Sequence, residues 1–302
     1  TTGSKTKVIS KIKRDSGAVY VELGIDTRKN KAIKSGEERK SWIDDKTQEE
    51  IQHGLRIQTL MKAKYQRGKK SVYQYLRMTS IVNPHATISL EVRDRHGEII
   101  EEGYWPRNTN ELPRVVKEIE PHPHGIHLGT LQRMLRESEK KNMVDFLHES
   151  FSSVAESRAK KLLDEAGLEY SRQPRRIKSL DAERLLGCMQ RNKLPNPDLD
   201  CLSPIEGILI KKGMSKAIDS RFASTRTSNP KVSQGNPYQV EVGLVFGGDL
   251  KADSPIEILR FANRVPLMYQ QGGCALTKAI ESVNWRTYGL DQPGGRGIPK
   301  GP

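Results

Sequence analysis

The chain has 302 residues, which is enough for two or three domains with buried cores. Lysine and arginine exceed aspartate and glutamate by 51 − 37 = 14, and a surface this basic attracts polyanions without deciding among ribosomal proteins, RNA enzymes and DNA enzymes. The sequence contains no run of eighteen apolar residues and no signal-peptide pattern, so we expect no membrane partner and a cytoplasmic location.

Residues 1–125 are predicted to form a mixed unit of strands and helices. Alternation of apolar and polar residues predicts strands at 7–12, 18–23, 54–60 and 86–92. A helix is expected to follow Ser71, whose hydroxyl is a suitable N-cap. The proline-rich stretch 112–125 cannot continue a helix or a central strand, so we place a domain boundary there.

Residues 126–198 are predicted to be helical. Apolar residues recur at helical spacing, as at Leu131 and Leu135, and Gly167 closes one helix as its C′ residue. Ser179 is the expected N-cap of the last helix. The loop before that helix holds four cations and no acid, namely Arg172, Arg175, Arg176 and Lys178.

Residues 199–302 are predicted to return to strands. We expect strands at 208–210 and 238–246, with a mobile polar loop at 220–234 between them. A short helix is expected from Ala275, because apolar residues recur at helical spacing after it. That helix leads into a loop that carries two aromatic rings with a guanidinium between them.

Trp285, Arg286 and Tyr288 form this aromatic and cationic cluster. Aromatic side chains at a helix end commonly pack on the core, which is the structural interpretation. In the functional interpretation, Arg286 pairs with a phosphate while the two rings flank the sugar–phosphate backbone.

A basic turn, Arg67-Gly68-Lys69-Lys70, stands directly before the helix expected after Ser71. Most such charge runs are solvated. The alternative is a phosphate contact, in which Gly68 permits close approach, the cations neutralise charge and the helix dipole contributes. The loop 172–178 has the same two interpretations.

Three histidines, His122, His124 and His127, accompany prolines near the predicted boundary. No cysteine or carboxylate cluster lies with them, so we expect a domain junction and no metal site. The sequence also lacks the Gly-x-x-x-x-Gly-Lys-Ser/Thr phosphate loop.

Several of these stretches together resemble one family, the B subunit of type IIB DNA topoisomerases of the topoisomerase VI class. The resemblance to its transducer region is carried by residues 260–269, 271–275 and 285–292, which read RFANRVPLMY, QGGCA and WRTYGLDQ. The basic turn and the residues after it, 66–76 and 81–86, are similar to the family's DNA-binding loop. Residues 125–131, 146–151 and 158–161 are similar to its helix–two-turn–helix domain.

The resemblance implies an α+β multidomain fold with three parts. Residues 1–125 would be the C-terminal half of a GHKL (Bergerat-type) ATPase domain. Residues 126–198 would be the helix–two-turn–helix DNA-binding domain, and residues 199–302 the N-terminal part of a ribosomal S5-like transducer domain. The chain would then be an internal piece of the subunit that lacks both ends.

The resemblance also implies an ATP-dependent DNA topoisomerase subunit in an A2B2 holoenzyme. In the family, ATP and Mg²⁺ bind the complete B subunit, and ATP binding closes a homodimer of B subunits around a second DNA duplex. The A subunit cuts the first duplex of double-stranded DNA. For this chain the resemblance implies a nucleoid-associated location, no catalytic residue and no metal ligand, and the fragment alone is expected to be inactive.

Of the family's nucleotide site, the resemblance transfers only Gly54, near the adenine, because Leu55 replaces a threonine hydroxyl. Arg286 stands where the family has a lysine, which keeps the charge and adds a planar donor fork. Neutralisation of about four to six phosphates predicts a slope of log affinity against log salt of roughly −4 to −5. The implied DNA contacts are Arg67, Gly68, Lys69, Lys70, Arg172, Arg175, Arg176, Lys178, Trp285, Arg286 and Tyr288.

Two other interpretations stay open. A stand-alone nucleic-acid-binding protein without ATPase activity would be indifferent to DNA crossings and bends and would bind no A subunit. A scaffold whose basic surface meets an acidic protein would keep its DNA binding after Arg67, Lys69 and Lys70 are replaced by alanine.

Overall fold

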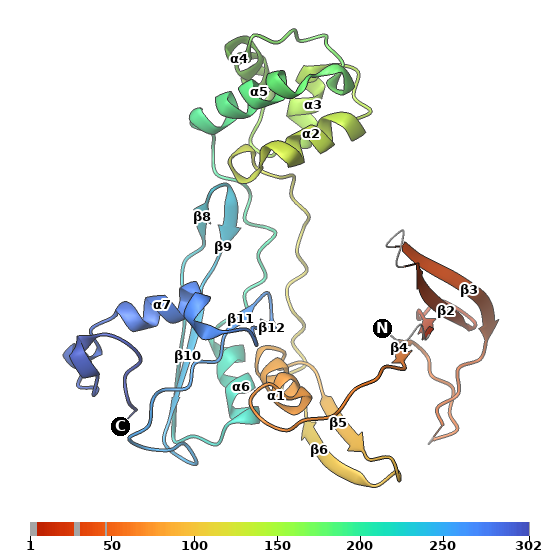
Figure 1. The fold of residues 1–302 in the computed structure, drawn as a ribbon, viewed down its shortest axis with the longest axis vertical. Helices are drawn as coiled ribbons and strands as arrows, with labels where there is room; N and C mark the ends of the chain where they lie inside the picture. The colour runs from red at the N-terminus through yellow and green to blue at the C-terminus, as the bar shows by residue number, and fades with distance from the viewer. Residues whose placement is uncertain (1–4, 27–30, 46, 302) are drawn as a thin grey trace. The chain divides into compact units, whose positions relative to one another are not determined.

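The computed structural model describes residues 5–26, 31–45 and 47–301 of the chain. The chain groups into two compact units, Thr1–Arg67 and Gly68–Pro302. Figure 1 colours the first unit red to orange and the second from orange to blue. Among the residues that the structure describes, none of the helices combines the length and the hydropathy that a membrane span requires.

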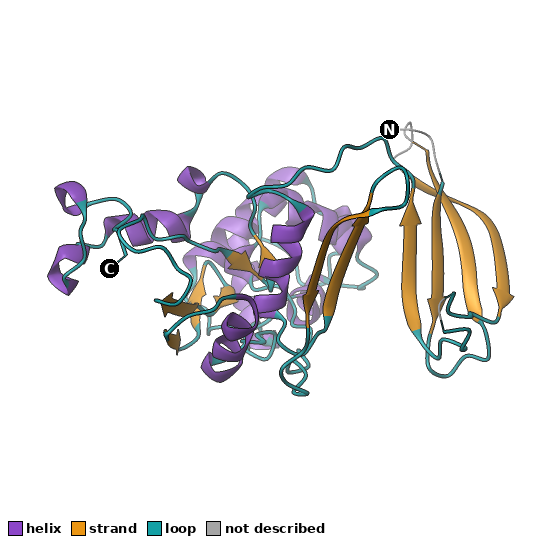
Figure 2. Ribbon diagram, turned by 90° about the horizontal axis from the view of Figure 1, so that it is seen from below, coloured by secondary structure: helices purple, strands orange, loops and turns teal. Residues whose placement is uncertain are grey.

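The first unit is a four-stranded antiparallel sheet with the strand order β3-β2-β1-β4, drawn as orange arrows in Figure 2. Its strands are β1 (Thr6–Lys11), β2 (Ala18–Asp26), β3 (Lys31–Lys40) and β4 (Gly54–Thr59). β1, β2 and β4 lie where the sequence predicts strands, but β4 is not half-buried as its alternation predicts, because its apolar residues are exposed. β3 is rich in charged residues and shows no such alternation, so its pairing with β2 determines its conformation. The described part of this unit contains no helix.

Trp42, in the loop between β3 and β4, covers the start of β4. Trp42 is 6% exposed, and its ring lies 3.5 Å from the position that a Cβ would take on Gly54. Gly54 has a φ of +153°, a conformation that side chains disfavour. On the same strand, Leu55 and Ile57 are 63% and 62% exposed. Gly54 therefore packs under the tryptophan, while the aliphatic residues after it face solvent.

The second unit begins with helix α1 (Val72–Val82), which starts where the sequence predicts. Ser71 Oγ accepts a hydrogen bond from the backbone nitrogen of Gln74 at 3.2 Å, as expected for an N-cap. A β-hairpin packs on this helix, with the ring centroids of Tyr73 and Trp105 5.2 Å apart. The hairpin strands are β5 (Ile88–Arg93) and β6 (Ile99–Trp105).

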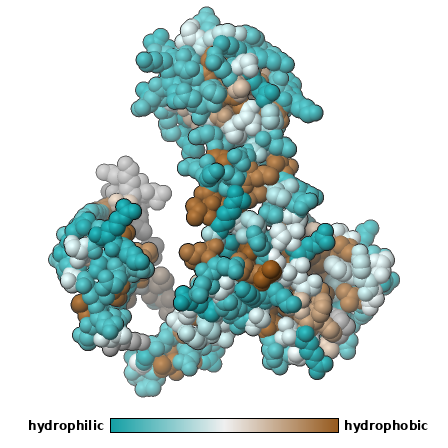
Figure 3. Space-filling view, turned by 180° about the vertical axis from the view of Figure 1, so that it is seen from behind, coloured by the Kyte–Doolittle hydropathy of each residue, from teal (hydrophilic) through white to brown (hydrophobic). Residues whose placement is uncertain are grey.

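The helical segment, residues 122–195, has an apolar core of its own, and the face of it seen in Figure 3 is mostly hydrophilic. Its helices are η1 (Pro123–Gly125), α2 (Leu128–Glu137), α3 (Met143–Ser150), α4 (Glu156–Ala166), η2 (Pro174–Arg176) and α5 (Ser179–Arg191). The residues that are 0% exposed include Leu131, Met143, Leu147, Leu162, Leu163, Leu185 and Met189. The helical spacing of apolar residues in the sequence therefore corresponds to a closed core.

The sequence predicts two helix ends in this segment, and one prediction is wrong. Gly167 ends α4 in the left-handed conformation, with φ 64°, and its N–H bonds the carbonyls of the last turn, as expected. Ser179 is not the cap of α5. The helix begins at Ser179, its N-cap is Lys178, and the Ser179 hydroxyl is within hydrogen-bond distance, 2.7 Å, of Gln132 Nε2. The Ser179 hydroxyl is thus engaged by the side-chain amide of Gln132 on α2 and does not cap α5.

Two histidines close the base of the helical segment. His122 is 5% exposed and its Nε2 lies 2.9 Å from the carbonyl oxygen of Pro195. His124 Nε2 lies 2.9 Å from the carbonyl oxygen of Asn192. A hairpin tip packs on the same point, because a Cβ on Gly235 would lie 2.6 Å from His122 Nδ1. That hairpin consists of β8 (Lys231–Ser233) and β9 (Asn236–Tyr238).

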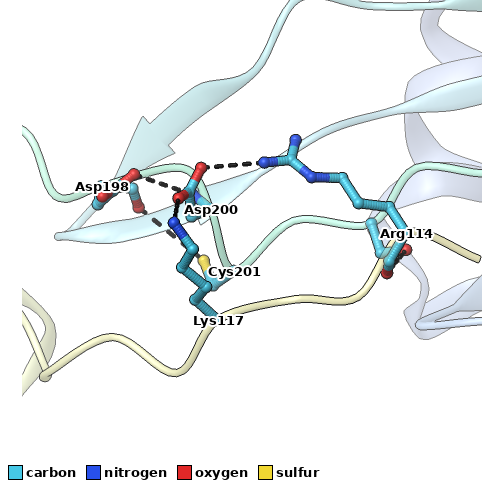
Figure 4. A network of polar contacts seen from close by, with 6 residues as sticks. Arg114, Lys117, Asp198, Asp200 and Cys201 are labelled. Atoms are coloured by element: carbon cyan, nitrogen blue, oxygen red, sulfur yellow. Dashed lines mark hydrogen bonds and ion pairs between the residues drawn. The ribbon is translucent and has the colours of Figure 1, made fainter.

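Asp200 joins the two connectors that lead into and out of the helical segment (Figure 4). Arg114 Nη2 lies 3.0 Å from Asp200 Oδ1, and Lys117 Nζ lies 2.8 Å from Asp200 Oδ2. The backbone nitrogen of Lys117 also donates to the carbonyl of Asp200 at 3.1 Å. The side chains and the backbone of these residues therefore hold the two connectors together.

Helix α6 (Gly207–Ala217) crosses α1 at short distance. A Cβ on Gly213 would lie 1.8 Å from the carbonyl oxygen of Ile81, so this approach requires glycine. Ile210 and Met214 are buried there, one helical turn apart. The strand predicted at 208–210 is therefore wrong, because a short apolar run does not distinguish a strand from one turn of a buried helix.

A two-stranded antiparallel sheet packs on α6. Gly243 permits the contact, because a Cβ there would lie 2.6 Å from the sulfur of Met214. The loop predicted at 220–234 is wrong. Residues 222–227 form a strand that pairs with residues 241–246, which lie within the strand predicted at 238–246. The two strands are β7 (Phe222–Thr227) and β10 (Glu241–Phe246).

The last part of the chain contains short elements, and the helix predicted from Ala275 is present as α7. Arg260 is 4% exposed and donates from Nη2 to the carbonyl oxygens of Leu267 and Tyr269, the former at 3.2 Å. The elements are β11 (Phe261–Ala262), β12 (Val265–Pro266), η3 (Gln271–Gly273), α7 (Ala275–Ser282), η4 (Trp285–Tyr288) and η5 (Pro293–Gly295).

Candidate nucleic-acid interface

The first candidate segment is the turn before α1. Gly68 has a φ of +121°, and its carbonyl accepts a hydrogen bond from the backbone nitrogen of Ser71 at 3.0 Å, which closes the turn. Beyond its chain neighbours, no described atom lies within 4 Å of a Cβ built on Gly68, so the backbone is open to approach. Lys69 and Lys70 are exposed at the positive end of the α1 dipole. Arg67 precedes this turn and is also exposed.

The second candidate segment is the loop 172–178, where Arg172 already has an acidic partner. Arg172 Nη1 lies 3.2 Å from Asp181 Oδ2, and Arg184 contacts the other carboxylate oxygen at 2.6 Å. The hydrogen bond from Arg184 and the charges of Arg172 and Arg184 lower the pKa of Asp181. The loop itself contains no acid, but the first turn of α5 returns Asp181 to it. The ion pair of Arg172 therefore links the loop to α5, and part of its guanidinium is already engaged in this contact.

The other cations of this loop are more available. Arg175 Nε donates to the carbonyl oxygen of Ser138 at 2.7 Å, which leaves the donors of its two Nη groups for a ligand. Arg176 and Lys178 are exposed. None of these three cations forms an ion pair with a described carboxylate. Phosphate contact by all four cations of this loop stays a prediction, and these three are the ones without a described acidic partner.

The third candidate segment is η4, in which the two rings differ in exposure. The indole Nε1 of Trp285 donates to the carbonyl oxygen of Ile280 at 2.8 Å, so Trp285 is anchored on α7. The ring centroids of Trp285 and Tyr288 are 6.0 Å apart. Tyr288 is 72% exposed. Trp285 is thus half-buried and anchored, whereas Tyr288 presents its ring to solvent, and the DNA contact of both stays a prediction.

Arg286 lies between these rings in the sequence, and its guanidinium is tethered at one edge. Its Nε donates to the carbonyl oxygen of Gln292 at 2.8 Å. No described carboxylate pairs with Arg286, whose side chain is exposed. The donors at Nη1 and Nη2 remain as a fork of the kind that binds phosphate in two places.

Gln292 is a residue of this site that the sequence does not identify. It is 0% exposed, and its Nε2 donates to the carbonyl oxygens of Val283 and Gly297 at 3.0 and 2.7 Å. Its Oε1 accepts from the backbone nitrogen of Trp285 at 2.8 Å. Glutamine is ordinarily exposed, so residue type gives no signal of burial.

The predicted nucleotide contact, Gly54, lies in the first unit and packs under Trp42 as described above. Within the described ranges, no group of three histidine, cysteine, aspartate or glutamate side chains is placed to hold a metal ion. The assignment of Gly54 to an adenine site stays a prediction.

The three candidate segments lie in different parts of the second unit in Figure 1. Each is held by bonds to its own neighbours, as in the contacts of Gly68 with Ser71 and of Arg286 with Gln292. Contact of all three with a single DNA duplex therefore stays a prediction that binding measurements must test.

Comparison with known proteins identifies the family of this chain. Residues 197–298 match the protein family described as "Topoisomerase VI B subunit, transducer". The matched range contains α6, the two-stranded sheets that follow it, and the turn η4. This result confirms the resemblance that the sequence shows in residues 260–292.

Curated relatives match over the full length of the chain. The B subunit of type 2 DNA topoisomerase 6 from Methanococcoides burtonii is 43% identical over 303 residues, covering 100% of this chain and 47% of the relative. The proteins of the same name from Archaeoglobus fulgidus and Metallosphaera sedula are 41% and 31% identical, covering 100% and 79% of this chain and 48% and 44% of those proteins. The chain spans about half the length of the curated relatives it matches. It belongs to the family of topoisomerase VI B subunits.

Proposed function

We propose that this chain is part of a B subunit that binds double-stranded DNA and links ATP-driven dimer closure to strand passage by an A subunit. The observation that carries the DNA contact is the exposed turn η4. There Arg286 has a tethered Nε, two Nη groups with donors to spare and no described acidic partner. A guanidinium so arranged is suited to a phosphate rather than to an internal ion pair.

In this proposal the three parts of the chain have separate roles. Residues 1–125 belong to the C-terminal half of a GHKL ATPase domain in this proposal, although β1–β4 and the segment α1, β5 and β6 fall in different compact units of the chain. Residues 126–198 form a helix–two-turn–helix domain, which the closed core of α2 to α5 supports. Residues 199–302 are the start of an S5-like transducer that relays closure toward the A subunit.

ATP and Mg²⁺ are requirements of the complete subunit in this proposal. The described residues do not fit these groups by themselves, because Gly54 is covered by Trp42 and no cluster of ligands for a metal lies among them. The chain contributes DNA contacts and the path of coupling, and no chemical step is assigned to its residues.

The test is a titration of a labelled duplex with the full chain across a series of salt concentrations. The proposal expects a slope of log affinity against log salt of roughly −4 to −5. Replacing Lys69 and Lys70 by alanine should reduce that slope by about 2, since each lost phosphate contact removes about 0.9. Arg176→Ala should reduce it by about 1 without changing thermal stability.

A matched control removes charges that are already paired. Lys160 and Lys161 lie on α4, with their Nζ atoms 2.6 and 4.0 Å from Glu156 and Glu165. Replacing both lysines by alanine changes the net charge equally but should leave the slope unchanged. A slope near zero for the unchanged chain would contradict DNA binding. An equal loss in both double variants would contradict the assigned segment, since net charge alone would then explain the affinity.

Two further arms separate the proposal from the stand-alone alternative. A topoisomerase subunit should prefer crossed or bent duplexes over linear ones and should associate with an A subunit. Equal affinity for all three DNA forms together with no association would favour a nucleic-acid-binding protein without a motor partner.

A further inference from the structure

Gln292 is a fully buried polar residue in a part of the chain that is otherwise mostly exposed. The residues from η4 to η5 are short turns without buried apolar residues, yet Gln292 is 0% exposed among them. Burying an amide costs free energy unless its donors and its acceptor are bonded. The bonding partners of Gln292 therefore indicate what its burial achieves.

The side chain of Gln292 connects three segments. Its Oε1 accepts from the backbone nitrogen of Trp285 at 2.8 Å. Its Nε2 donates to the carbonyl oxygens of Val283 at 3.0 Å and Gly297 at 2.7 Å. Both amide donors and an acceptor position are in use, so the amide has one orientation that satisfies it. These bonds fix the start of η4 against the end of α7 and against the chain after η5.

The backbone of Gln292 holds Arg286 directly. Its carbonyl oxygen accepts from Arg286 Nε at 2.8 Å. The guanidinium is planar and its five N–H groups have fixed directions, so a bond at Nε determines where the two Nη groups point. A lysine presents its three donors from a single nitrogen on a flexible stem, so a bond to this carbonyl would not fix a planar, two-point contact with a phosphate.

We propose that Gln292 is a positioning residue that fixes Arg286 so that the free edge of its guanidinium meets a phosphate of the DNA duplex. This inference rests on the proposed function, because that function assigns a phosphate to Arg286. The buried amide sets the position of the Gln292 carbonyl, and the carbonyl sets the plane of the guanidinium. A bidentate contact with phosphate depends on that plane.

The test measures duplex affinity of the full chain for Arg286→Ala, Gln292→Ala, the double variant and Arg286→Lys. Arg286→Ala should weaken binding by about ten-fold, the size of a charge-assisted hydrogen-bonded contact. Gln292→Ala should weaken it by about three-fold or more, because the charge stays but its direction is lost. The double variant should bind no more weakly than Arg286→Ala. Arg286→Lys should bind like Gln292→Ala while it keeps the salt slope of the unchanged chain.

The outcomes separate this inference from the proposed function. Unchanged affinity in Arg286→Ala would show that the DNA contact itself is wrong. A weakened Arg286→Ala with an unchanged Gln292→Ala, or a double variant that loses the product of both effects, would overturn the positioning role. If Gln292→Ala does not fold, Arg286→Lys decides alone, because it leaves the bonds of the Gln292 side chain intact. Affinity equal to that of the unchanged chain would then overturn the proposal.

Discussion

The helical segment and the C-terminal segment, residues 260–301, are stabilised in opposite ways. The buried side chains of the helical segment are almost all apolar, and most of them come from four helices that share one core. In the C-terminal segment the buried side chains include Arg260, Thr277 and Gln292, at 4%, 1% and 0% exposed. Apolar burial is non-directional, whereas buried polar groups require particular partners. Apolar burial holds the helical segment together as a compact domain. In the C-terminal segment, the buried polar groups fix the directions of a few side chains where little apolar surface is buried.

The largest effect is expected from a cavity in the helical segment. Leu147 is 0% exposed in its core, so Leu147→Ala should lower the free energy of unfolding by about 2–5 kcal/mol. Leu180 on the same segment is 67% exposed, and Leu180→Ala should change it by less than about 0.5 kcal/mol. Chemical denaturation followed by circular dichroism measures both. Equal losses in the two variants would show that this core is not closed as described.

The next effect tests a close backbone approach outside both segments. Gly213→Ala would place a Cβ 1.8 Å from the carbonyl oxygen of Ile81, which is backbone and cannot rotate away. We expect a loss of about 1–3 kcal/mol, or a displaced α6. Gly129 in α2 has no described atom within 4 Å of its built Cβ, and Gly129→Ala should instead stabilise the chain by about 0.4–1 kcal/mol. Opposite signs in thermal unfolding support the crossing of α1 and α6, and equal signs contradict it.

The difference between the segments also explains which features the sequence predicts. The core of α2 to α5 follows from residues such as Leu131 and Leu135, because apolar spacing reports a buried helix face directly. At α6 the same signal is too short to distinguish a helix from a strand, and the helix becomes evident only in the structure, where it crosses α1 at Gly213. β7 escapes prediction because its serine and threonine residues become a strand only by pairing with β10.

For the candidate site, too, some features follow from the sequence and others depend on contacts that only the structure shows. Cationic and aromatic residue types are sufficient to propose the three segments, since phosphate binding depends on charge. Which of those side chains are available depends on partners elsewhere in the chain. Asp181 forms an ion pair with Arg172, and the carbonyl of Ile280 accepts a hydrogen bond from the indole of Trp285. Gln292 has no signal of its own, because its burial follows from the three hydrogen bonds of its side chain rather than from its polarity.

A smaller effect is expected in the C-terminal segment, where a substitution should raise the free energy of unfolding rather than lower it. Thr277 Oγ1 is buried and has no hydrogen-bond partner among the described residues. Thr277→Val keeps the branched shape and removes an unsatisfied group, so stability should stay equal or rise by about 1 kcal/mol. Thermal unfolding measures the change. A clear loss would mean that the hydroxyl has a partner in the folded chain.

The last prediction concerns pH and returns to the helical segment, where His122 is an exception to apolar burial. Burial lowers the pKa of His122 below the ordinary value of 6.5. Its Nδ1 accepts from the backbone nitrogen of His124 at 3.2 Å, so a proton on Nδ1 would break that bond. Because the folded pKa is lower than the unfolded one, the stabilisation is complete above pH 6.5 and is lost as pH falls through the folded value.

Denaturation midpoints measured from neutral to mildly acidic pH should therefore fall for the unchanged chain. His122→Asn offers a matched control, because the Asn amide oxygen can accept the bond from His124 and does not titrate in this range. Its midpoint should depend less on pH, even if it is lower overall. The same pH dependence in both proteins would assign the effect to other groups. The histidine would then act as a buried, hydrogen-bonded packing residue of the junction, and its titration would not determine the stability of the chain.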